Sequence, residues 1–122
     1  MRESELKKIE NGELVKAYAN AAVAHRQASW GGDYKRANKE YDTIAAIYRE
    51  LRERGESAQR LLLPLLEHPD PAVKSWAAAH ALEFSPNEGE RVLEELSQGT
   101  GMLSLNAETT LSEWRKGTLS FP

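Results

Sequence analysis

The stretch LLLPLLEHPDPAVKSWAAAHAL, residues 61–82, decides the fold of this chain. It consists of an apolar run, a short break at residues 68–71 and a second apolar run. Asp70 followed by Pro71 is a common start of a helix, because the aspartate caps free backbone amides and proline suits the first helical position. Pro64 lies inside the first run and predicts a kink or a break there. The stretch therefore predicts two helices joined by a tight turn.

The same arrangement returns about 30 residues further along the chain. Four apolar positions align with later ones, namely Leu62 with Leu93, Leu65 with Leu96, Val73 with Leu103 and Leu82 with Leu111. Residues 13–54 add a third, looser hairpin. Because such units cannot bury an apolar face alone, they stack side by side. The repeat predicts a short right-handed α-solenoid of about three helical hairpins, similar to HEAT and armadillo proteins.

Apolar periodicity predicts helices over residues 13–29, 34–54, 57–66, 71–84, 86–97 and 103–116. No alternation typical of β-strands occurs, so the predicted fold class is all-α. We expect a single domain over residues 1–122, with residues 1–12 as an N-terminal extension and residues 117–122 as a tail that is frayed or laid on the surface.

Several residues mark where these helices begin and end. Gly31 and Gly32 stop the first helix, and Asp33 is placed to cap the second. Ser85 and Glu88, three residues apart, have the pattern of a capping box, in which each side chain bonds the other residue's amide. These signals place the turns of the predicted hairpins.

Composition excludes several classes of protein. The chain has no cysteine, which excludes disulfides, thiol chemistry and zinc sites built on cysteine. No apolar run reaches the length of about 18 residues needed to cross a membrane. The first residues are charged and lack the apolar segment of a secretory signal, so we expect a cytoplasmic location.

Charge is unevenly spread along the chain. The net charge is −3, but residues 1–60 hold 12 Lys/Arg against 10 Asp/Glu, and residues 61–122 hold 4 against 9. The acidic second half disfavours a nucleic-acid groove there and suits a basic partner. Five glutamates form an acidic band over the fourth and fifth predicted helices, namely Glu83, Glu88, Glu90, Glu94 and Glu95. The band is either a solvated helix surface or a docking site, and in the second case Glu83, Glu90 and Glu94 are its contact residues.

Part of the opening stretch, LLPLLEHPDPAVKSWAAAHAL, resembles a HEAT repeat. The matching residues are Asp70, Pro71, Val73, Lys74, Ala77, Ala78 and Leu82. The resemblance implies that the aspartate caps a helix, that the valine packs into the core and that the alanine pair lets neighbouring helices approach closely. The match is weaker in the last unit and absent as a motif in the first.

Most of the chain, from about residue 13 to residue 117, is also similar to a small bacterial family, domain of unknown function twenty-nineteen. The resemblance rests on LVKAYANAAVAH, on ANKEYDTIAAIYREL with Gly55, on the HEAT-like unit, and on the final Ala107, Leu111, Trp114 and Gly117. Such small helical-repeat proteins resemble candidate immunity proteins of bacterial toxin systems. The resemblance implies a protein partner, such as a toxin.

Catalytic and metal-binding patterns are missing from the sequence. The three histidines, His25, His68 and His80, do not form a two-histidine motif with metal-ligand spacing. There is no Gly-rich phosphate loop and no Ser-His-Asp order. We therefore expect no enzyme activity, no cofactor and no metal.

One polar pair stands out on the second predicted helix. Asn38 and Asp42 are four residues apart, so they share one side of that helix, and the family resemblance also puts weight on them. Two interpretations remain open. Either the pair bonds groups of the preceding helix, or it faces a concave binding groove.

Aromatic residues are frequent for so short a chain. The positions Tyr34, Ala37, Tyr41, Ile44, Tyr48 and Leu51 form an apolar stripe on the second predicted helix. We expect Tyr41, Tyr48, Trp76 and Trp114 in the core. Trp30 lies in the turn SWGGDY and is expected to be exposed, where an aromatic side chain can anchor a partner.

These features favour a non-enzymatic protein-interaction module that binds and occludes a partner, as an immunity or regulatory protein does. The candidate contact residues are Trp30, Asn38, Asp42, Glu83, Glu90 and Glu94. One alternative is a nucleic-acid-binding or DNA-repair-like HEAT module, which the net negative charge disfavours. Another is a self-assembling scaffold, because a short solenoid has exposed ends that can pair into homo-oligomers.

Overall fold

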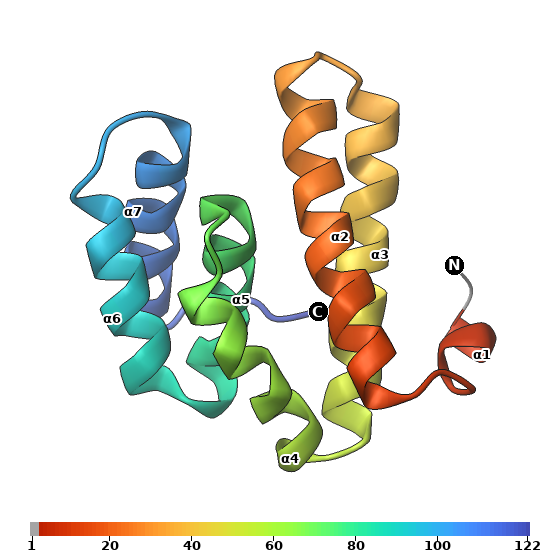
Figure 1. Ribbon diagram of the computed structural model, residues 1–122. Helices are drawn as coiled ribbons and strands as arrows, with labels where there is room; N and C mark the ends of the chain where they lie inside the picture. The colour runs from red at the N-terminus through yellow and green to blue at the C-terminus, as the bar shows by residue number, and fades with distance from the viewer. Residues whose placement is uncertain (1–2) are drawn as a thin grey trace. The chain divides into compact units, whose positions relative to one another are not determined.

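The computed structural model of the protein describes residues 3–122 (Figure 1). Within this range the chain forms seven α-helices and one 3-10 helix and no β-strand, so the prediction of an all-α fold is confirmed. Five of the six predicted helices occur with ends within two residues of the expected positions. The chain divides into two compact units, one ending at Leu61 and the other spanning Leu62–Phe121.

The first unit is a long helical hairpin with two short helices. Its elements are α1 (Glu3–Leu6), α2 (Asn11–Trp30), α3 (Tyr34–Glu53) and α4 (Glu56–Gln59). Helices α2 and α3 lie side by side and antiparallel, joined by a tight turn (Figure 1). Their large core side chains are completely buried, namely Leu14, Tyr18, Ile44, Tyr48 and Leu51. These positions recur at three- and four-residue intervals, as expected for the facing sides of two packed helices.

The two ends of this hairpin are packed differently. Helices α1 and α4 contact α3, and Figure 1 places both beside its C-terminal end, away from the α2–α3 turn. In that part of α3 five consecutive residues, 44–48, are buried. Near the turn, the buried residues are the small Ala28 of α2 and Ala37 of α3. Small residues let the helices approach closely, and larger side chains at the edge of the contact then remain outside it.

The predicted apolar stripe of α3 is therefore only partly correct. Tyr48 is buried as expected, but Tyr34 is 74% exposed and Tyr41 is 50% exposed. Placing Tyr41 in the core was wrong, because periodicity identifies the apolar side of a helix but not where along its length other elements cover it. Trp76 and Trp114, also expected in the core, are half-buried.

The second unit begins inside a 3-10 helix, η1 (Arg60–Glu67), and continues with α5 (Pro71–Phe84), α6 (Pro86–Ser97) and α7 (Met102–Arg115). The predicted helix over 57–66 is thus not one α-helix but α4 followed by η1, which contains Pro64. Proline has no amide hydrogen to donate and its ring obstructs the preceding turn, which explains why the α-helix does not continue. Helix α5 contacts both α6 and α7.

The start of α5 matches the prediction. The carboxylate of Asp70 accepts a hydrogen bond from the amide of Ala72 at 2.9 Å, and Pro71 is the first helical residue. The Asp70 amide donates to Nδ1 of His68 at 3.0 Å. Val73 is completely buried, so its expected place in the core is confirmed.

Helices α5 and α6 approach each other closely at Gly89. A Cβ atom at this position would lie 2.7 Å from the carbonyl oxygen of Ala78 and 2.9 Å from the backbone nitrogen of Leu82. The facing side of α5 is formed by small buried residues, Ala77, Ala78 and Ala81. The alanine pair therefore allows close helix packing, as the resemblance implies, and glycine is required opposite it.

The predicted capping box at Ser85 is absent. Ser85 precedes α6, but its side chain makes no capping hydrogen bond. The reason lies in the connection, which is a single residue between α5 and α6. The Ser85 amide donates to the carbonyl of Ala81 at 2.6 Å, so it already ends α5 and is not free to donate to the Glu88 carboxylate.

The C-terminal tail is held by hydrogen bonds to the end of α7 and is not frayed. The backbone amide and the hydroxyl of Thr118 both donate to the carbonyl of Glu113, at 2.9 and 3.1 Å. Leu119 and Phe121 are half-buried. Across the described helices, none combines the length and the hydropathy that crossing a membrane would require.

Candidate functional site

The α2–α3 turn positions an exposed group of aromatic side chains. Helix α2 ends at Trp30, and Gly32 adopts a positive φ of 78°, a conformation that favours glycine. Asp33 then caps α3, accepting a hydrogen bond from the amide of Arg36 at 3.1 Å. The tight turn places Trp30 and Tyr34 on either side of it. Trp30 is 71% exposed, in agreement with the prediction.

We call Trp30, Tyr34 and Tyr41 the aromatic surface. Tyr34 and Tyr41 are seven residues apart on α3 and therefore lie on the same side of that helix. The guanidinium carbon of Arg26 lies 5.1 Å from the centre of the Trp30 ring, a cation–π distance, and holds the indole over α2. All three side chains stand on helices, which fix the positions of their Cα atoms.

Asn38 and Asp42 belong to the same side of α3. Both side chains are exposed, and within residues 3–122 neither takes part in a side-chain hydrogen bond. In this structure the pair therefore does not bond groups of the preceding helix. Their positions relative to Tyr34 and Tyr41 bring three of the predicted contact residues, Trp30, Asn38 and Asp42, to one end of the first unit.

The acidic band of the second unit is partly neutralised within the protein. A nitrogen of Arg115 lies 2.5 Å from a carboxylate oxygen of Glu94 and 3.7 Å from one of Glu90. Arg91 pairs in the same way with Glu95, at 3.2 Å. Glu83 is exposed on α5. The sequence identifies the band but not these arginines, which come from other turns and helices.

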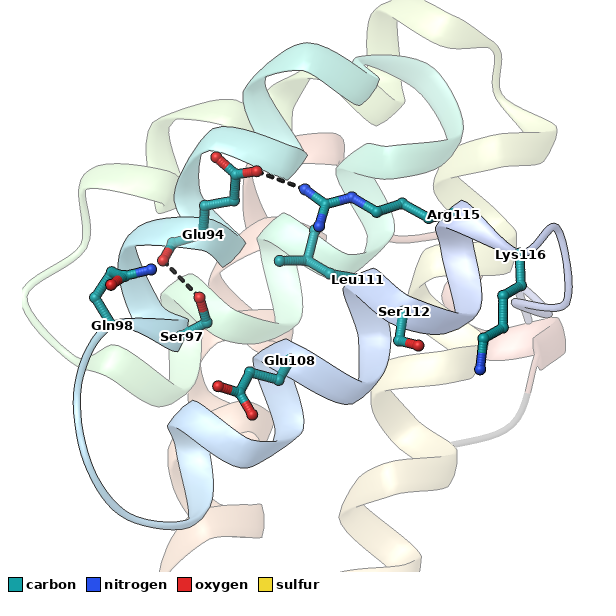
Figure 2. Close-up of a pocket in the computed structure, with 8 residues that line it drawn as sticks. All are labelled: Glu94, Ser97, Gln98, Glu108, Leu111, Ser112, Arg115 and Lys116. Atoms are coloured by element: carbon teal, nitrogen blue, oxygen red, sulfur yellow. Dashed lines mark hydrogen bonds and ion pairs between the residues drawn. The ribbon is translucent and has the colours of Figure 1, made fainter.

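An open groove of about 600 Å³ lies between α6 and α7, beside the Glu94–Arg115 pair (Figure 2). Its lining residues are Glu94, Ser97, Gln98, Glu108, Leu111, Ser112, Arg115 and Lys116. The Ser97 hydroxyl donates to the Glu94 carbonyl at 2.7 Å, so this hydroxyl bonds the helix backbone and no histidine stands beside it to activate it. The groove offers charges of both signs and a weakly apolar floor at Leu111.

The histidines are dispersed through the described residues. His80 is buried on α5, with its ring centre 6.0 Å from that of Trp76. His25 lies half-buried on α2, where burial lowers its pKa and the charge of Glu40 opposes that shift. Among residues 3–122 no three acidic or histidine side chains are placed to hold a metal ion.

Comparison with known proteins identifies the family. Residues 12–113 match the model described as Domain of unknown function (DUF2019). The chain belongs to this family. The predicted family resemblance is therefore confirmed. None of the curated proteins matches the chain.

A solved crystal structure has a fold similar to that of this chain. The protein RPA1889 from Rhodopseudomonas palustris CGA009 is similar to this chain with a TM-score of 0.90 and 25% sequence identity. The similarity covers 96% of this chain and 98% of that one. The similarity extends over both compact units of the present structure.

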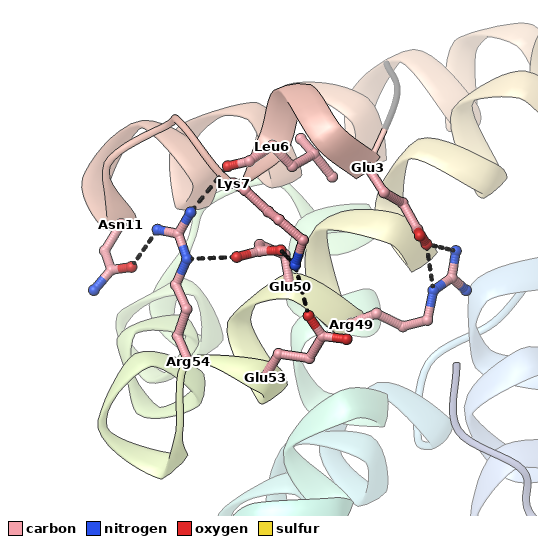
Figure 3. Close-up of polar contacts among 8 residues, drawn as sticks. All are labelled: Glu3, Leu6, Lys7, Asn11, Arg49, Glu50, Glu53 and Arg54. Atoms are coloured by element: carbon pink, nitrogen blue, oxygen red, sulfur yellow. Dashed lines mark hydrogen bonds and ion pairs between the residues drawn. The ribbon is translucent and has the colours of Figure 1, made fainter.

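Residues 3–11 precede the part that matches the DUF2019 model, yet they are tightly held (Figure 3). Leu6 is completely buried. The guanidinium of Arg54 donates to the Leu6 carbonyl at 2.9 Å and to the Asn11 side chain at 2.8 Å. Arg49 pairs with Glu3 at 3.2 Å. The sequence interpretation of residues 1–12 as an extension gives no sign of this packing.

Glu50 is the centre of the cluster in Figure 3. It is 7% exposed and accepts hydrogen bonds from Arg54 at 2.8 Å and from Lys7 at 3.4 Å. Bonding to Arg54, and secondarily to Lys7, holds the pKa of Glu50 below its ordinary value although burial opposes this. Two cations around one buried carboxylate balance its charge. This arrangement indicates that Glu50 stabilises the contact between residues 3–11 and α3 and does not serve as a catalytic acid.

Proposed function

We propose that the protein is a non-enzymatic protein-binding module that docks its partner on the aromatic surface. The observation that carries this proposal is the exposure of Trp30, Tyr34 and Tyr41 together, at 71%, 74% and 50%. Aromatic side chains contribute most of the affinity of many protein interfaces, because they bury a large area at a small cost in side-chain entropy.

The setting of these side chains supports the proposal. Asn38 and Asp42 add hydrogen-bonding groups beside the aromatic rings, in the manner of the polar rim of an interface. The rings stand on two packed helices whose buried residues near the turn include Ala28 and Ala37, so little backbone ordering is needed when a partner binds. The acidic band, with exposed Glu83 and the paired Glu90 and Glu94, contributes by attracting a basic partner over longer distances.

The finer architecture and the biological role belong to the same proposal. We propose a right-handed, HEAT-like stack of hairpins, supported by the Asp70 cap, the buried Val73 and the close α5–α6 contact. The role is to occlude the active surface of a cytoplasmic bacterial protein, as an immunity or regulatory protein does. This role rests on the resemblance between small helical-repeat families and candidate immunity proteins.

The test is capture of a partner by tagged protein expressed in its native host, with two matched variants. Trp30→Ala/Tyr34→Ala removes the aromatic surface, and Glu83→Gln/Glu90→Gln/Glu94→Gln neutralises the acidic band. We expect one stoichiometric protein that the first variant loses and that the second retains, with a binding strength that depends less on salt. If both variants retain the partner equally, the aromatic surface is not the docking site.

Nucleic acid is the informative alternative outcome. Lys35 is exposed on α3 directly after Tyr34, and a cation beside an aromatic side chain can bind single strands by charge and stacking. Asp33 and Asp42 lie on either side of Lys35 in the sequence and are also exposed, which favours a protein partner. Recovery of nucleic acid that Tyr34→Ala releases would replace the proposed function with a nucleic-acid-binding one.

A further inference from the structure

The exposed side of α3 has a symmetric arrangement about Asn38. Successive residues of an α-helix are turned by about 100°, so Tyr34 and Tyr41 lie within about 60° of Asn38 on one side. Lys35 and Asp42 lie within about 60° of it on the other side. All five side chains are exposed. The face therefore has an aromatic edge, a charged edge and an amide at its centre.

Such a face is complementary to a copy of itself. When two α3 helices run antiparallel about a two-fold axis at Asn38, each edge meets the same edge of the other copy in the opposite order. Tyr34 then meets Tyr41 of the second copy, and Lys35 meets Asp42 of the second copy, each contact occurring twice. The two Asn38 amides meet at the axis, where each can donate to and accept from the other.

We propose that a second copy of this chain occupies the aromatic surface, through antiparallel pairing of the two α3 helices about Asn38. This inference rests on the proposed function, because it states what occupies the docking surface when the partner is absent. Charge complementarity supports it. Within residues 3–122 neither Lys35 nor Asp42 is in an ion pair, and the pairing supplies an opposite charge to both.

The size of the face sets the strength of the pairing. Two tyrosines bury at most about 200 Å² each, so each copy contributes well under the roughly 800 Å² of a standard stable interface. An interface of this size is typical of weak, transient association. A partner that binds the aromatic surface more tightly displaces the second copy, so self-pairing keeps Tyr34 and Tyr41 covered until that partner is present.

The experiment is sedimentation equilibrium of the purified full chain over a roughly hundredfold range of concentration, with four variants. Lys35→Asp and Asp42→Lys each place like charges opposite one another and are expected to weaken the dimer at least about tenfold. The double variant Lys35→Asp/Asp42→Lys restores the opposite charges and is expected to recover most of the dimer. Arg36→Asp is the matched control, because Arg36 is exposed on the other side of α3 and its reversal leaves the dimer unchanged.

The rescue separates pairing from misfolding, because a variant that unfolds is not restored by a second exposed change. A wild-type chain that stays monomeric at the highest concentration would overturn the inference. A dimer that the charge exchange does not rescue would also overturn it, because the pairing would then use another surface. Neither result bears on the proposed function, which is decided by whether Trp30→Ala/Tyr34→Ala loses the captured partner.

Discussion

Helix pairs α2–α3 and α5–α6 both have alanines where they contact each other, yet their larger side chains differ in exposure. In α5 the valine at 73 and the histidine at 80 are buried, because α6 and α7 both contact this helix. Near the α2–α3 turn the buried residues are the small Ala28 and Ala37, and Tyr34 and Tyr41 remain exposed. Small residues bring two helices together, but a further element is needed to cover what lies beside the contact. The exposed end is where we propose that a partner binds.

The sharpest way to break this comparison is to place a charge at one position of each pair. Val73→Asp buries a charge without a counterion, and we expect it to abolish the cooperative unfolding of the second unit at a cost of more than about 4 kcal/mol. Tyr34→Asp places the same group at the exposed first turn of α3, where a negative charge is favourable, and we expect a change within about 0.5 kcal/mol. Thermal unfolding followed by circular dichroism measures both. If the two variants lose the same stability, positions 73 and 34 are equally buried, which would contradict the comparison of the two helix pairs.

A second prediction concerns the close approach of α5 and α6. Gly89→Ala places a methyl group against the backbone of Ala78 and Leu82, neither of which can move aside, so we expect a loss of about 1–3 kcal/mol. Gly12→Ala is the matched control in α2. No atom lies within 4 Å of a Cβ at Gly12, and alanine is expected to stabilise that helix by about 0.5–1 kcal/mol. Urea denaturation gives both values, and the same sign for the two variants would contradict the packing described here.

The free energy of unfolding should depend on pH through Glu50, near the C-terminal end of α3. The pKa of Glu50 is lowered from its ordinary value of 4.5, chiefly by Arg54, so the folded state binds this proton less readily than the unfolded state. Its contribution to stability is therefore complete well above pH 4.5 and is lost as the pH falls below that value through the lowered pKa. Glu50→Gln should cost about 1–2 kcal/mol at neutral pH and should reduce the loss of stability on acidification.

Urea midpoints measured at intervals of pH provide the test. Asp42→Asn is the control, since Asp42 is exposed near the turn and has no hydrogen-bonded cation among residues 3–122. An acid dependence that Glu50→Gln leaves unchanged would show that the cluster around Glu50 contributes nothing to the folded state.

Sequence patterns identified most of the fold because the signals that carry it are local. Asp70 and Pro71 start α5, glycines end α2, and the apolar repeat places α5, α6 and α7. Part of the candidate site was also predicted, since Trp30 was expected in an exposed turn. The prediction that Tyr41 is in the core is wrong, because its burial depends on contacts between residues distant in the chain. The sequence does not predict the hydrogen bonds from Arg54 to Leu6 and Asn11 for the same reason. The pairing of Glu94 with Arg115 was missed for the same reason.

The smallest predicted effect separates two helix starts that look alike in sequence, Asp70-Pro71 and Ser85-Pro86. The Asp70 carboxylate accepts the Ala72 amide, so Asp70→Ala should cost about 1 kcal/mol. Ser85 makes no such bond, because its backbone also has to end α5, so Ser85→Ala should change the stability by less than about 0.3 kcal/mol. Both values come from urea denaturation. If Ser85→Ala costs as much as Asp70→Ala, the serine hydroxyl caps α6 in solution, and the single-residue connection between α5 and α6 does not prevent it. A near-zero value would mean that Pro86 and the packing of α6 start this helix without help from the serine.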